Sequence, residues 1–181
     1  VKIDSSWIIL AILITWSLAE GVFPAYFEDM PASNYWAMGV AGALGLFLSI
    51  IFHELSHSLV ARRFGILMKG ITLFIFGGVA EMSEEPPSAR AEFFTAIVGP
   101  VSSVLIAAVF YGVLGIGEAS GWPPAVNGVL FYLVWVNFLL ALFNLLPAFP
   151  LDGGRVLRSI LWSRKKNLLW ATRVSSRVGS A

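Results

Sequence analysis

Four long apolar stretches, separated by short polar segments, dominate the pattern of hydrophobic positions along the chain. They cover residues 7–27, 36–61, 93–116 and 125–146. A helix needs about 20 predominantly apolar residues to cross a hydrocarbon core about 30 Å thick, and each stretch approaches or exceeds that length. The pattern therefore predicts an all-α polytopic membrane protein with about four spans in this chain.

The segment between the second and third spans follows a different pattern. In residues 69–82, β-branched and aromatic residues and an apolar/polar alternation flank a pair of glycines, which favours a hairpin over a helix. We expect a small membrane-associated β-hairpin here and a single transmembrane core domain over residues 1–181. The chain begins without methionine and ends in a basic stretch without a helix cap, so we expect it to be a fragment whose C-terminal part is missing.

Composition and charge support a membrane location. Hydrophobic residues make up 57% of the chain and charged residues only 13%, a balance that suits lipid as the solvent. All 12 Lys and Arg residues lie at position 2, between positions 62 and 90, or from position 155 onward. The positive-inside rule then assigns the amino terminus and the 62–90 connection to the cytoplasmic side of a multi-pass cell-membrane protein. Such one-sided charge suits anionic lipid headgroups better than nucleic acid.

A metal-binding motif lies on the second apolar stretch. Residues 53–57, HELSH, fit the pattern H-E-x-x-H, which on a helix brings two imidazoles to one face about 6 Å apart. His53 and His57 are the only histidines of the chain, and ionisable groups at membrane depth are costly and usually functional. We predict that they bind one catalytic zinc ion about 10 Å below Arg62, with Glu54 as the general base. Helix packing alone is the weaker alternative.

Catalytic zinc normally takes three protein ligands and a water molecule, and the chain has no third histidine and no cysteine. A carboxylate must therefore complete the site. Asp152 is the best candidate, because it lies in NLLPAFPLDGG (144–154), where two prolines break the helix and two glycines permit close backbone approach. The alternative role of Asp152 is to cap a helix at 153–162.

The other carboxylates are less suitable as a third ligand. Glu20 faces the outer side in the topology above. Four more belong to the cytoplasmic connection, where we expect exposure to solvent: Glu81, Glu84, Glu85 and Glu92. We also expect Arg155 and Arg158, which follow Asp152 closely, to reach the membrane interface by extending their long side chains.

Together, HELSH at 53–57 and NLLPAFPLDGG at 144–154 resemble the site-2 protease family of intramembrane metalloproteases. FGGVAEM (76–82) and AIVGP (96–100) are also similar to that family. The resemblance covers roughly residues 1–162 and is closest to the bacterial and archaeal members that often carry cystathionine-β-synthase-type domains.

The resemblance implies a zinc metalloendopeptidase that hydrolyses peptide bonds within or near transmembrane segments of membrane-protein substrates. It implies His53, His57 and Asp152 as zinc ligands and Glu54 as the catalytic base. Asn144 is implied as a substrate-binding residue, and a backbone bridge across the proline break is an equal alternative for it. A non-proteolytic zinc-binding membrane regulator is the alternative function. A transporter with a metal site is less favoured, because the sequence shows no internal repeat.

Overall fold

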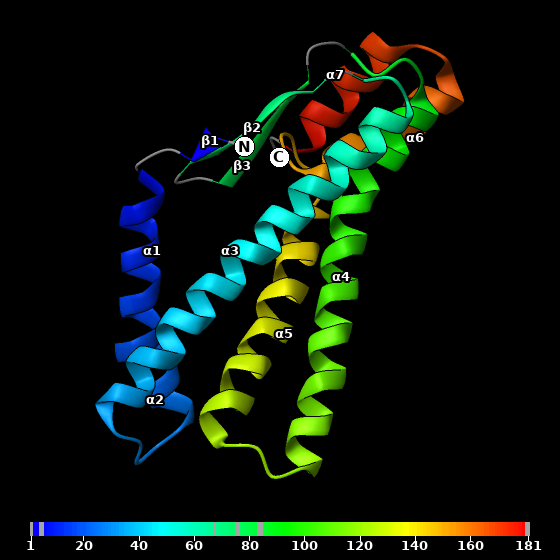
Figure 1. Ribbon diagram of the computed structural model, residues 1–181. Coiled ribbons are helices and arrows are strands. Elements are labelled where there is room, and N and C mark those ends of the chain that lie inside the picture. Colours follow the sequence, from blue (N-terminus) through cyan, green and yellow to red (C-terminus); the bar gives the residue numbers. More distant parts are fainter. Residues whose placement is uncertain (1, 4–5, 67, 75–76, 83–84, 180–181) are drawn as a thin grey trace.

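A computed structural model of the chain describes residues 2–3, 6–66, 68–74, 77–82 and 85–179. Helices account for most of it (Figure 1). In chain order they are α1 (Ser6–Ser17), the short π-helix η1 (Leu18–Val22), α2 (Phe23–Tyr26), α3 (Ala32–Arg63), α4 (Ala89–Ala119), α5 (Pro124–Asn144), α6 (Asp152–Lys165) and α7 (Leu168–Val178).

Four helical segments are long and apolar enough to cross a membrane, and they coincide with the four predicted spans. They are the continuous run Trp7–Tyr26 and the helices α3, α4 and α5. Large apolar side chains on their outer faces are exposed, among them Ile8, Leu48 and Leu105. Exposed apolar faces of this extent suit lipid as the surrounding medium. The chain is therefore a multi-pass membrane protein.

Small residues let the helices of the bundle approach closely, as is common between membrane helices. A Cβ atom added at Gly45 of α3 would lie 2.6 Å from the Leu133 side chain of α5, so a larger residue there would require that side chain to move. The same two helices share a buried polar contact, because the Asn137 amide donates to the Ser49 hydroxyl at 2.9 Å. These contacts hold α5 against α3, next to α4 (Figure 1).

A small sheet lies at one end of the bundle. It contains β1 (Lys2–Ile3), β2 (Met68–Phe74) and β3 (Gly77–Met82) in the order β1-β2-β3. β2 pairs with β3 antiparallel, in the segment for which the sequence predicts a hairpin, although residues 75–76 lie outside the described residues. The parallel pairing of β1 with β2 was not predicted. Two-residue β1 is too short to give a period-two pattern.

The two ends of the bundle differ. Figure 1 shows the sheet, α6 and α7 at one end, and α2 with the α4–α5 connection at the other. The segments that contain the Lys and Arg residues thus gather at a single end of the bundle. This is the end at which the two histidines of α3 and the start of α6 meet.

Candidate metal centre

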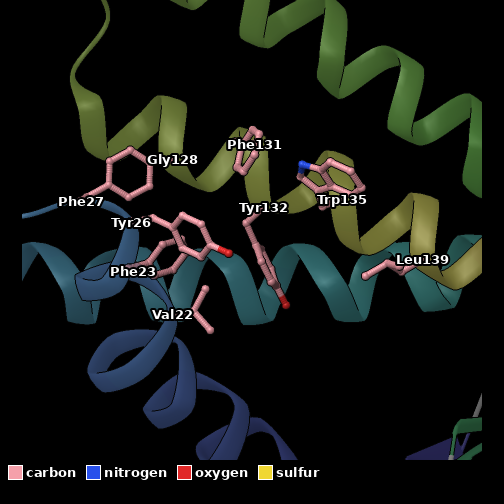
Figure 2. Close-up of a pocket in the computed structure, with 9 residues that line it drawn as sticks. All are labelled: Val22, Phe23, Tyr26, Phe27, Gly128, Phe131, Tyr132, Trp135 and Leu139. Atoms are coloured by element: carbon pink, nitrogen blue, oxygen red, sulfur yellow. The ribbon is translucent and has the colours of Figure 1, made fainter.

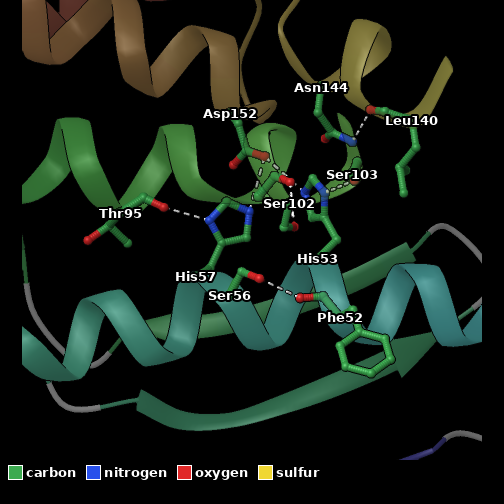
Figure 3. Close-up of polar contacts among 11 residues, drawn as sticks. Phe52, His53, Ser56, His57, Thr95, Ser102, Ser103, Leu140, Asn144 and Asp152 are labelled. Carbon is green, nitrogen blue, oxygen red and sulfur yellow. Dashed lines mark hydrogen bonds and ion pairs between the residues drawn. The ribbon is translucent and has the colours of Figure 1, made fainter. Parts of the chain in front are cut away.

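His53 and His57 lie one turn apart on α3, as the H-E-x-x-H spacing predicts. Their side chains are buried, with 3% and 5% of the residue surface exposed. The ring centroids are 4.9 Å apart, and the ring planes cross at 73°. Both rings point from α3 toward α4 (Figure 3). The two imidazoles therefore present one shared polar site between α3 and α4.

Asp152, at the start of α6, completes this site. Its Oδ2 atom lies 3.2 Å from Nε2 of His53 and 3.1 Å from Nε2 of His57 (Figure 3). The residue at the N-cap of α6 is Leu151, so Asp152 is not the cap that the alternative interpretation required. The ligand atoms of the three side chains all lie within 4.8 Å of one another and form a potential metal-binding group.

The DGG sequence at 152–154 explains how the backbone brings the Asp152 carboxylate to the two histidines. After α5 ends at Asn144, backbone of the connection 145–151 packs against the first residues of α6. A Cβ atom at Gly153 would lie 2.2 Å from the Leu145 carbonyl oxygen, and one at Gly154 would lie 2.8 Å from the Ala148 carbonyl. No larger residue fits against this backbone. Two glycines directly after Asp152 are therefore needed to turn its side chain toward the histidines.

Helix α4 supplies the other side of the site, a contribution that the sequence analysis missed. Nδ1 of His57 donates to the Thr95 carbonyl oxygen at 2.6 Å, and Nδ1 of His53 lies 2.9 Å from the Ser103 hydroxyl. Between them, a Cβ atom at Gly99 would lie only 2.2 Å from Nε2 of His57. The spacing 95, 99, 103 of small and hydroxyl residues on an apolar helix was the available signal. These contacts orient both rings, as outer partners of metal-binding histidines do.

The donor atoms fit a zinc ion. A carbonyl oxygen only accepts, so Nδ1 of His57 carries a proton and Nε2 of the neutral ring has a free lone pair. That lone pair faces an oxygen of Asp152, which is also an acceptor, and two acceptors at 3.1 Å need a cation between them. Zinc bonds of about 2.0–2.2 Å in tetrahedral arrangement place ligand atoms about 3.3–3.6 Å apart. The observed separations of 3.1 and 3.2 Å are slightly shorter than that spacing, so a small outward shift of the side chains admits the ion.

The carboxylate is held in its ligand form. Burial raises the pKa of Asp152, but the adjacent His53 and His57 imidazoles outweigh it and lower the pKa to about 2. Asp152 also lies in the first turn of α6, where the helix dipole stabilises a negative charge. It is therefore ionised at neutral pH, as a metal ligand must be.

Two other predicted site residues lie near this group. Glu54, the neighbour of His53, is half-buried and interacts electrostatically with both imidazoles and with Asp152. It is not one of the three side chains that converge in the described part of the chain. Asn144 is half-buried at the end of α5, and its amide donates to the Leu140 carbonyl at 2.8 Å (Figure 3). That bond runs back into its own helix rather than across the proline break.

The remaining carboxylates do not compete for the site. Glu20 and Glu85 are exposed, and the side chains of Glu81 and Glu84 lie outside the described residues. The expectation of an exposed Glu92 was wrong, because this residue is fully buried and hydrogen-bonded to Arg158.

Arg158 also differs from the prediction. Its guanidinium is hydrogen-bonded to the buried Glu92, because α6 packs against α4.

A hollow at the opposite end of the bundle has no comparable chemistry. It measures about 440 Å³ and lies between α2 and α5 (Figure 2). Its walls are mainly aromatic, with Phe23, Phe131 and Trp135 among them. No imidazole or carboxylate lines it. The histidine–aspartate group is therefore the candidate functional site.

Comparisons with known proteins agree on one family. The model of peptidase family M50 matches residues 41–122 and 112–181. Rip3 of Mycobacterium tuberculosis is 42% identical over 180 residues, which are 98% of this chain and 45% of Rip3. Zinc metalloprotease MJ0392 of Methanocaldococcus jannaschii is 38% identical over 154 residues, covering 84% of this chain and 42% of that protein.

A solved structure shares the fold. The site-2 protease from Methanocaldococcus jannaschii is 31% identical, with a TM-score of 0.61 over 94% of this chain and 72% of that one. The chain spans less than half the length of Rip3 and of MJ0392.

Proposed function

Since the chain belongs to peptidase family M50, we propose that this protein is an intramembrane zinc metalloprotease that hydrolyses peptide bonds within or near transmembrane segments of membrane-protein substrates. One observation carries the proposal. Two imidazoles and a carboxylate converge to 3.1 and 3.2 Å inside a bundle of apolar helices, and a further carboxylate follows the first histidine. The printed name of MJ0392, a zinc metalloprotease, supports zinc as the metal.

The chain's own residues have distinct tasks in this proposal. His53, His57 and Asp152 hold the zinc ion, which when bound acts as a Lewis acid toward water and the substrate carbonyl. Glu54 accepts a proton from the attacking water and returns it to the amine nitrogen of the leaving peptide.

Asn144 is the proposed substrate contact. It lies at the end of α5, eight residues before Asp152, and its amide keeps one more N–H for a substrate carbonyl while the other bonds to Leu140.

The proposed arrangement in the membrane follows the charge distribution. We assign residues 1–181 to one transmembrane core domain, with the amino terminus and the end that contains the sheet and α6 facing the cytoplasm. All Lys and Arg residues gather at that end, as the positive-inside rule requires. The antiparallel strands β2 and β3 lie there too, and we assign them to the membrane surface, where they can bind an unwound substrate segment by strand addition.

A single substitution tests the proposed chemistry. Glu54→Gln removes the proton acceptor and leaves all three ligand side chains in place. The purified variant in detergent should keep its zinc, measured by elemental analysis, and lose cleavage of a reconstituted transmembrane peptide by at least about 100-fold. Glu118→Gln, the same change at an exposed position of α4, is the matched control and should cleave normally.

Two results would count against the proposal. Normal cleavage by Glu54→Gln would remove Glu54 from the chemistry. An unaltered protein that contains zinc but cleaves no transmembrane peptide would favour the non-proteolytic regulator instead.

A further inference from the structure

A buried ion pair joins α4 and α6 next to the metal site. Glu92, in the first turn of α4, is completely buried. Its Oε1 atom accepts a hydrogen bond from Nε of Arg158 at 2.6 Å and a second from Nη2 of the same guanidinium. The guanidinium thus forks onto a single carboxylate oxygen, and such charge-assisted hydrogen bonds are stronger than neutral ones.

The same guanidinium also contacts the connection that leads to Asp152. The Cζ atom of Arg158 lies 5.3 Å from the centroid of the Phe149 ring, and Phe149 precedes Asp152 by three residues. A cation over an aromatic face is attracted to it. Arg158 therefore links three parts of the fold, which are its own helix α6, the connection 145–151, and the start of α4.

These links lie close to the metal site along both helices. Arg158 follows Asp152 by six residues, or about 9 Å along α6, and Glu92 precedes Thr95 by three residues, or about 4.5 Å along α4. Thr95 in turn accepts the hydrogen bond from His57. The ion pair thus joins the helix that carries the carboxylate ligand to the helix that orients a histidine ligand.

We propose that the Glu92–Arg158 pair is a positioning device that fixes α6 on α4 in the register that brings Asp152 to both imidazoles. A metal site tolerates ligand displacements of only about 0.2 Å, so a small slip of α6 is enough to weaken it. The inference rests on the proposed zinc site and adds two residues that act on the metal only through Asp152 and His57.

Removing one member of the pair should lower zinc affinity without unfolding the bundle. In Glu92→Gln, the Arg158 guanidinium loses its counter-charge and its forked partner, and α6 is free to shift. We expect zinc binding to weaken by about 10–100-fold, the usual effect of removing an outer partner of a metal ligand. Because Arg158→Gln breaks the same pair, the double variant Glu92→Gln/Arg158→Gln should bind zinc no more weakly than the weaker single variant.

The experiment measures zinc dissociation constants of the whole chain in detergent by competition with a chelator. Circular dichroism confirms that each variant is folded, and the visible spectrum of the Co²⁺-loaded protein reports whether the carboxylate still binds. Glu118→Gln, at the exposed far end of α4, is the matched control and should bind zinc as the unaltered protein does. If Glu92→Gln does not fold, the zinc dissociation constant of Arg158→Lys is measured instead. This variant keeps the positive charge and loses the forked contact, and the same tenfold threshold for weakened zinc binding applies to it.

The outcomes separate this inference from the proposed function. If the unaltered protein binds no zinc, the proposed function fails. If the unaltered protein binds zinc but a folded Glu92→Gln weakens binding by less than about tenfold, the positioning role alone is overturned. Single-variant losses that multiply in the double variant also overturn it, because the two residues would then act independently.

Discussion

Gly99→Ala tests whether α4 packs directly against the two imidazoles of the metal site. The added Cβ atom would lie 2.2 Å from Nε2 of His57 and 2.7 Å from Nε2 of His53, whereas ordinary contact begins at 3.4 Å. His57 must therefore retreat by about 1.2 Å and His53 by about 0.7 Å, both well beyond the 0.2 Å or so that a metal site tolerates. Neither ring can retreat freely, because Thr95 and Ser103 hold their Nδ1 atoms.

The magnitude follows from this overlap. Overpacking of a close-packed interior costs about 1–3 kcal/mol. If that strain is stored at the site, zinc affinity falls by about 5–150-fold, and the loss of ligand geometry adds to it. We expect the helices to remain folded, because the contact involves two side chains rather than helix backbone.

Chelator competition on the purified protein measures this loss. Gly112→Ala is the matched control, since it makes the same change on the same helix at a position where a Cβ atom meets nothing within 4 Å. The control should bind zinc normally and be slightly more stable, because alanine favours a helix over glycine. A Gly99→Ala protein that binds zinc as tightly as the unaltered protein would refute the placement of Gly99 beneath the imidazoles.

Three further predictions follow from the same contacts. Ser103→Ala removes the partner of His53 Nδ1 and should weaken zinc binding about 10–100-fold. Ser102→Ala is the control and should not weaken it, because the Ser102 hydroxyl bonds within its own helix. Equal zinc dissociation constants for the two variants would disprove the role of Ser103 as the partner of His53. Asn137→Ala removes the buried bond to Ser49 and should lower stability by roughly 0.5–2 kcal/mol, seen in thermal unfolding, with zinc affinity of the folded protein unchanged. Removal of zinc by a chelator should lower the unfolding temperature, and added zinc should restore it, because a ligand that binds only the folded state stabilises that state. Identical melting curves with and without zinc would contradict a metal site built from the folded helices.

The elements that sequence analysis predicted well are those governed by local pattern. The four membrane helices follow from runs of apolar residues, and the one-turn spacing of His53 and His57 follows from helix geometry. Asp152 was selected by elimination among carboxylates and by the proline and glycine residues around it, and it does meet the two rings. The role of Asp152 as a zinc ligand and the role of Glu54 as the general base remain predictions.

The contributions of α4 and α6 could not be predicted in the same way, because they depend on which helices pack together. Small residues at 95, 99 and 103 are compatible with any close helix contact, and only the packing of α4 on α3 turns them toward the imidazoles. Glu92 seemed exposed because it follows a polar connection. Its burial depends on Arg158, which is 66 residues away in sequence.

X-ray absorption at the zinc edge shows whether a carboxylate from the start of α6 closes a site begun by two imidazoles of α3. For the zinc-loaded protein, we expect two imidazole nitrogens and a carboxylate oxygen at about 2.0–2.2 Å. Asp152→Ala should keep both imidazoles and lose one protein oxygen, with weaker zinc binding. A ligand shell that is unchanged in Asp152→Ala, or one that lacks the two imidazoles in the unaltered protein, would contradict it.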